Sequence, residues 1–278
     1  MKGLFHFILS HSIFIAFCAA ALSLQTLQLL NHPINFYRLG FIFFATLAGY
    51  NAYWMVSKWS FNKTSSLAPF LLKNKSSFLV MASAIVGMFF CLTRVHLVMY
   101  NTILTFILLA LYAVPVMPFR FLHFTRKAGF LKTIVLAFAW TMVTTLIPLQ
   151  VSIVALDHAA QLIFLNRFLF MLMLCIIFDK RDAAVDKIRG LQSLATDIRP
   201  TLLHFFIGLI FIGYSWISFS MSAYGILLPQ VIALLLTGCI TIGVYTSSMK
   251  KRGYLFYYFL VDGLMFLSAL LTGLATIY

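Results

Sequence analysis

Nine long apolar stretches constrain the fold of this 278-residue chain more than any other feature. Each is long enough to cross the roughly 30 Å of a bilayer's hydrocarbon core as a helix. They cover residues 4–30, 36–57, 77–94, 96–117, 129–150, 160–178, 201–219, 223–246 and 254–277. Backbone polar groups find no water inside a bilayer, so helices are expected there. The sequence therefore predicts an all-α integral membrane protein whose nine transmembrane helices form a single bundle, as one domain over residues 1–278.

The composition supports a membrane protein. Hydrophobic residues make up 63% of the chain and charged residues 9%, whereas a soluble domain has about 25% charged residues. All four cysteines lie in apolar stretches without the spacing of a metal site, so we expect them to be small core residues. The net charge of +14 is better explained by topology and anionic lipid headgroups than by nucleic acid. The expected partner is the lipid bilayer, and no nucleic-acid partner is expected.

The positions of the basic residues predict the orientation. All but three of the 20 Lys and Arg residues fall in loops on one side of the nine predicted spans, the exceptions being Arg38, Arg94 and Arg167. Loops rich in Lys and Arg stay in the cytoplasm. The N-terminus is therefore predicted to be cytoplasmic and the C-terminus outside, in a multi-pass protein of the cytoplasmic (inner) membrane.

Acidic residues are scarce and concentrated. The chain has six Asp and no Glu, and three of the six are Asp179, Asp182 and Asp186. At about 100° per residue, these positions fall within roughly 60° of one another on a helix. Converging carboxylates suit a hard cation such as Mg²⁺, which in turn binds phosphate groups. The alternative is a surface segment whose carboxylates are neutralised by the interleaved Lys and Arg residues.

The residues around the aspartates resemble a family motif. From Asp179 to Leu194 the pattern is Asp-x-x-Asp-x-x-x-Asp-Lys-x-x-Gly-x-x-Ser-Leu. It is similar to the second aspartate-rich motif of the UbiA superfamily of intramembrane prenyltransferases. These proteins are nine-helix bundles that carry the motif on the cytoplasmic side, after the sixth helix. Span count, chain length, orientation and motif position agree, so the resemblance covers the entire chain.

The resemblance implies a chemistry. Members transfer an isoprenyl group from a prenyl diphosphate to a lipophilic acceptor, often an aromatic ring or a quinone precursor, and Mg²⁺ neutralises the departing diphosphate. By this resemblance Asp179, Asp182 and Asp186 are expected to be Mg²⁺ ligands. Lys187 and Arg189 are expected to contact diphosphate oxygens.

The first aspartate-rich motif of the family is degenerate in this chain. The family has Asn-Asp-x-x-Asp after the second helix, and the corresponding residues here run from Asn51 to Met55. Asn51 is kept, but Ala52 and Met55 replace the two carboxylates. Lys58 offers a partial substitute, because a lysine can neutralise phosphate as a point charge. Asn51 and Lys58 are thus further candidates for diphosphate binding, and a solvated basic loop is the alternative for Lys58.

Two other functions remain open. Loss of the first motif favours a non-catalytic or rewired member of the fold, which binds an isoprenoid or a partner. A transporter is less favoured, because the predicted spans contain few polar residues at depth besides Asn101, Arg167 and Asp262.

Arg167 and Asp262 fall inside the sixth and ninth predicted spans. An unpaired charge at depth is costly, so each should have a partner or a cavity. Counting about 1.5 Å per residue from the cytoplasmic ends gives depths of roughly 17 Å and 12 Å. These depths predict a structural ion pair, with a cavity-lining role for Arg167 as the alternative.

Tyr112 and Arg120 stand near the end of the fourth predicted span. They resemble a tyrosine-plus-basic pair of the family at that helix end, although the spacing differs and two prolines intervene. A tyrosine at a membrane interface also serves as an anchor. Both interpretations of Tyr112 stay open.

Overall fold

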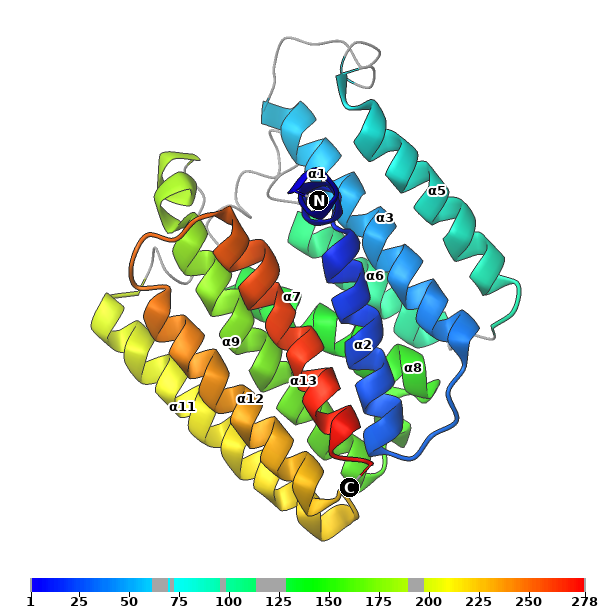
Figure 1. The fold of residues 1–278 in the computed structure, drawn as a ribbon, viewed down its shortest axis with the longest axis vertical. Coiled ribbons are helices and arrows are strands. Elements are labelled where there is room, and N and C mark those ends of the chain that lie inside the picture. The colour runs from blue at the N-terminus through cyan, green and yellow to red at the C-terminus, as the bar shows by residue number, and fades with distance from the viewer. Residues whose placement is uncertain are drawn as a thin grey trace.

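The computed structural model describes residues 2–61, 70, 73–95, 99–113, 129–189 and 198–277. Within these ranges the regular elements are all helices, so the predicted all-α class is confirmed there. Figure 1 shows the long helices running side by side as one bundle, with α13 ending beside the end of α2.

The helices follow the apolar stretches closely. In chain order they are α1 (Lys2–Ser10), α2 (Ile13–Leu29), α3 (Phe36–Phe61), α5 (Lys75–Leu92), α6 (Met99–Ala113), α7 (Gly129–Thr141), the π-helix η3 (Met142–Leu146), α8 (Ile147–Leu149), the 3₁₀-helix η4 (Ile153–Ala155), α9 (His158–Arg189), α11 (Pro200–Ser220), the 3₁₀-helix η5 (Met221–Tyr224), α12 (Leu228–Ser247), the π-helix η6 (Phe256–Val261) and α13 (Asp262–Leu274). Proline in the first turn starts α11 and α12, where its missing N–H has no helical partner to lose.

Seven of the described helices are long and apolar enough to cross a membrane. They are Phe36–Trp59, Lys75–Leu92, Leu131–Leu149, His158–Ala183, Pro200–Tyr224, Leu228–Ser247 and Phe256–Leu274. The pair Gly3–Ser10 and Ile13–Leu29, bent by 65°, gives an eighth if it is one span, and Tyr100–Tyr112 is a shorter apolar helix. A multi-pass membrane protein is confirmed, while the ninth span and the orientation of the termini stay predictions.

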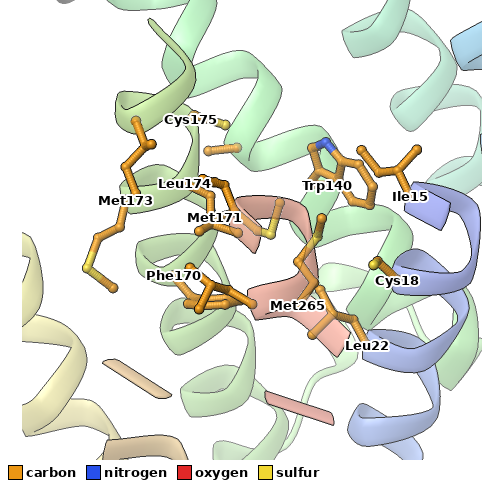
Figure 2. Close-up of a cluster of buried hydrophobic side chains, with 14 of the residues drawn as sticks. Ile15, Cys18, Leu22, Trp140, Phe170, Met171, Met173, Leu174, Cys175 and Met265 are labelled. Atoms are coloured by element: carbon orange, nitrogen blue, oxygen red, sulfur yellow. The ribbon is translucent and has the colours of Figure 1, made fainter. Parts of the chain in front are cut away.

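The centre of the bundle is formed by α2, α7, α9 and α13. Figure 2 shows Met265 of α13 between Leu22 of α2 and Phe170 and Met171 of α9, with Trp140 of α7 beside them. All five side chains are buried. Thioether and aromatic side chains fill irregular gaps well, so this core needs no strict helical periodicity.

The hairpin of α11 and α12 is closely packed. Gly225 has a φ of 89°, in the left-handed region that glycine tolerates, and it turns the chain between η5 and α12. A Cβ at Gly238 of α12 would lie 2.6 Å from Cε1 of Tyr214 of α11. Small residues let membrane helices approach closely, and this position requires one.

Candidate functional site

Most of the charged candidate site residues whose side chains are described lie at one end of the bundle. At this end α3 and α9 end and α7 begins, and it is called the basic end below, after Lys58, Lys132, Lys180 and Arg181. It is the upper end of α3 and α9 in Figure 1. The aspartate motif begins here, on the last turns of α9.

Asp179 joins side chains from four helices. The Thr133 hydroxyl of α7 donates a hydrogen bond to its carboxylate. Next to Thr133, the Lys132 ammonium lies 5.3 Å from the ring centroid of Tyr112 of α6. The Tyr112 ring is in turn 5.6 Å from that of Tyr53 of α3. These five residues, called the Asp179 cluster below, place an acid, a cation and two aromatic rings together.

Asp182 belongs to a different group of side chains. Arg181 binds its carboxylate with two hydrogen bonds, from Nε at 2.7 Å and from an η nitrogen at 2.8 Å. The guanidinium also lies over the rings of Phe178, Tyr257 and Tyr258, at 4.8, 5.4 and 4.9 Å. The bidentate pairing and the cation–π contacts both stabilise the Arg181 guanidinium in this position. Both oxygens of Asp182 are therefore occupied by Arg181.

The convergence predicted for the three aspartates is not seen for the two whose side chains are described. Asp179 faces α7, and Asp182 is held by its neighbour beside η6. Among the described side chains, no group of three His, Cys, Asp or Glu residues could hold a metal ion. Asp186, Lys187 and Arg189 lie on the last turns of α9, and their side chains fall outside the described part, so their roles stay predictions.

On α3, the remnant of the first motif has a structural contact. Asn51 is 3% exposed and donates through its side-chain amide to the carbonyls of His11 and Leu47, both at 2.9 Å. His11 lies in the bend between α1 and α2, so Asn51 ties α3 to this bend. Lys58 is exposed in the last turn of α3. Its part in diphosphate binding stays a prediction, and Arg120 lies outside the described residues.

A third carboxylate follows the residues that cover Arg181, and the sequence did not associate it with the site. Asp262 opens α13 directly after the π-helix η6, is 3% exposed, and its Oδ1 has no hydrogen-bond partner among the described residues. Tyr258, four residues earlier in η6, lies 4.9 Å from the guanidinium of Arg181. π-Helical turns often occur at functional sites. The sequence did contain a signal for this role: Asp262 is an acidic residue near the start of the last apolar stretch, on the side of the membrane where most Lys and Arg residues lie.

The predicted ion pair between Arg167 and Asp262 is wrong. Arg181–Asp182 is the ion pair that the described residues form. Arg167 donates to the hydroxyl of Thr26 of α2, whereas Oδ1 of Asp262 has no hydrogen-bond partner among the described residues. The depths of the two residues, counted from the predicted ends of the spans, were not accurate enough to predict whether they pair.

Two solved structures share the fold over nearly the whole chain. A structure of digeranylgeranylglyceryl phosphate synthase superposes with a TM-score of 0.61 at 12% identity, covering 100% of this chain and 99% of that one. The apo structure of a UbiA homolog from Aeropyrum pernix K1 gives 0.61 at 14% identity, covering 97% and 98%. The chain therefore has a UbiA-type membrane prenyltransferase fold.

The other two comparisons found nothing similar. No protein-family model matches the sequence, and no curated protein does. The likeness is thus one of fold, at low sequence identity.

The donor set at the basic end fits magnesium in part. Mg²⁺ requires oxygen ligands, usually carboxylates and water. On the α9 side Asp179 has a carboxylate, and Asp182 has one whose oxygens are held by Arg181. On the α3 side Ala52 and Met55 have no side-chain oxygen. These residues fit a cation held from α9 and do not fit one shared between two acidic motifs.

Proposed function

We propose that the protein is a membrane prenyltransferase that binds a prenyl diphosphate at the basic end and transfers its isoprenyl group to a lipophilic acceptor in the bundle. The Asp179 cluster carries this proposal, because it brings an acid, a cation and aromatic rings from four helices to one place. The positive-inside distribution of Lys and Arg supports a cytoplasmic location for this end, where the charged diphosphate group is in contact with water.

The basic residues of this end bind the diphosphate. Lys132 lies inside the Asp179 cluster, and Lys58, Lys187 and Arg189 add positive charge around it. Asp179, Asp182 and Asp186 would hold Mg²⁺, which neutralises the diphosphate as it departs. Asp182 becomes available to a cation only when Arg181 releases it, and Arg181 is then free to bind a phosphate oxygen.

The transfer itself is a substitution at the allylic carbon. The C–O bond breaks and its electron pair leaves with the diphosphate, while the acceptor forms the new bond and loses a proton. The faces of Tyr53 and Tyr112 favour the positive charge that develops on the allylic group. Asp262 is the buried carboxylate with an oxygen available to accept the proton.

A second candidate is a non-catalytic or rewired protein of the same fold that binds an isoprenoid. Two observations favour it. Asp182 is neutralised by Arg181, and the amide of Asn51 is engaged by backbone carbonyls. Such a protein would retain the isoprenoid without transferring it.

Binding and turnover separate the two candidates. The purified protein in lipid nanodiscs is titrated with geranylgeranyl diphosphate, with and without Mg²⁺, by calorimetry. Lys132→Met should weaken binding, while Lys75→Met, which removes an exposed lysine, serves as the matched control. Diphosphate release on addition of an aromatic acceptor supports the transferase, and binding without release supports the second candidate. Absence of binding under both conditions contradicts both.

A further inference from the structure

Arg167 lies in the buried middle of α9, and no described side chain forms an ion pair with it. Its side chain is 4% exposed, one η nitrogen is 3.3 Å from the Thr26 hydroxyl, and the other has no hydrogen-bond partner. A charge at depth in a membrane protein is costly, and such residues mark binding sites and pathways. Its neighbour Asn166, in contrast, donates to both Tyr214 and Ser218.

This arginine is far from the basic end. It precedes Asp179 by twelve residues of α9, which is about 18 Å along the helix. A diphosphate at the Asp179 cluster is therefore out of its reach. Whatever occupies the free side of Arg167 is a different chemical group.

The irregular end of the span Leu131–Leu149 borders Arg167, through the contact that Thr26 makes with both. After α7 the chain passes through η3, the short α8 with Pro148, and Gln150, which has a φ of 58°. Side chains of three other helices donate to carbonyls of this segment: Thr26 of α2 to Thr144, Arg38 of α3 to Pro148, and Asn101 of α6 to Val151. Irregular backbone at membrane depth is tolerated where it is buried in protein or lines a cavity.

Unpaired polar atoms gather around this segment. Among the described residues, six buried side-chain atoms have no hydrogen-bond partner, and four of them are Nε of Arg38, Oδ1 of Asn101, Oγ1 of Thr145 and an η nitrogen of Arg167. Three of the four can donate a hydrogen bond. The excess of donors, two of them on arginines, calls for an oxygen-rich, negatively charged group.

The neighbours of Arg167 on its own helix are apolar. Phe164, Phe170 and Met171 stand three or four residues away, share its helix face and are buried. In Figure 2, Phe170 and Met171 point toward Leu22 and Met265. A ligand at this place needs an apolar body beside its charged group.

We propose that Arg167 binds the carboxylate of a lipophilic acid that enters from the membrane. The guanidinium fork matches a carboxylate with two parallel hydrogen bonds and equal, opposite charge. A diphosphate would bring more negative charge than one buried arginine neutralises. This site is additional to the one at the basic end and does not depend on prenyl transfer.

Oleate is a suitable probe, with methyl oleate as its uncharged analogue. Binding of radiolabelled oleate to the protein in nanodiscs is measured at alkaline pH, where the acid is ionised. Arg167→Met should weaken oleate binding about tenfold or more, and Arg167→Lys should weaken it less, because the charge remains. Arg94→Met removes an exposed arginine and should leave oleate binding unchanged.

Three results would overturn the proposal. They are equal binding of oleate and methyl oleate, unchanged oleate binding by Arg167→Met, and equal loss of oleate binding in Arg167→Met and in the control Arg94→Met. Asp179→Asn separates this site from the basic end, because it should alter geranylgeranyl diphosphate binding and leave oleate binding intact. Wild-type oleate binding with no diphosphate binding would support this site and contradict the proposed function alone.

Discussion

Arg181 and Arg167 lie on the same helix, but their surroundings differ sharply. Arg181 is near the end of α9, binds Asp182 through two hydrogen bonds and is covered by aromatic rings. Arg167 is deeper, has a long contact with Thr26, and has no carboxylate partner among the described side chains. A pair at a partly exposed position contributes little to stability, whereas an unpaired buried charge lowers it. This difference is the basis of the proposal that Arg167 serves a bound group, whereas Arg181 serves its ion pair.

The largest expected effect concerns Asp179. Asp179→Asn should weaken Mg²⁺-dependent binding of geranylgeranyl diphosphate about 10- to 100-fold, as is typical when a ligand or its support is lost. Asp182→Asn should have a smaller effect, because Arg181 already neutralises that carboxylate. Calorimetry on both variants checks the order. An equal loss in both would mean that the two aspartates act as one group.

The next effect tests the unpaired charge directly. Replacing a buried ion pair by apolar side chains of similar volume is often neutral or stabilising by about 1–4 kcal/mol, and a buried charge without a partner destabilises the fold further. Arg167→Met should therefore raise the melting temperature of the empty protein. Arg181→Met is the comparison, and it should not raise it. Destabilisation by Arg167→Met would assign Arg167 a structural role and remove the contrast between the two arginines.

Asn51→Ala should destabilise the protein by about 1–2 kcal/mol, because two hydrogen bonds to backbone carbonyls are lost. The affinity for geranylgeranyl diphosphate should not change if Asn51 serves only the bend between α1 and α2. Thermal unfolding and calorimetry give the two values. A loss of diphosphate affinity without a loss of stability would show that Asn51 takes part in diphosphate binding.

The smallest effect concerns release of Asp182. Arg181→Gln should change stability by less than about 1 kcal/mol, because Asp182 is 43% exposed and solvent screens its charge. Freed from Arg181, Asp182 should raise the affinity for Mg²⁺ roughly two- to fivefold. Titration with Mg²⁺ in the absence of diphosphate measures this. Unchanged affinity would show that Asp182 is not a ligand.

The sequence predicted the helices well, because each apolar stretch is continuous and the bilayer leaves the backbone little choice. It did not predict the bend at Ser12 or the π-helices η3 and η6, since they change the backbone without a break in hydropathy.

The site was predicted in part. The aspartates were found by their scarcity and spacing, but spacing does not show that Thr133 binds Asp179 or that Arg181 occupies Asp182. The first contact joins residues 46 positions apart. The second is between adjacent residues, which do not face each other in an ideal helix. Both contacts depend on helix packing and rotamers that one sequence does not contain.

The bend between α1 and α2 has a consequence for the surrounding lipid. Since α1 leaves the axis of α2 by 65°, a topology in which α2 alone crosses the bilayer would rely on its 17 residues, which span about 26 Å. Leu4, Phe5 and Phe7 of α1 are exposed, so α1 can lie in the headgroup layer. Lipid beside α1 then contacts a shorter hydrophobic surface than lipid beside the 26-residue α3. Membrane thickness thereby acts on the angle of this bend, which Asn51 connects to α3.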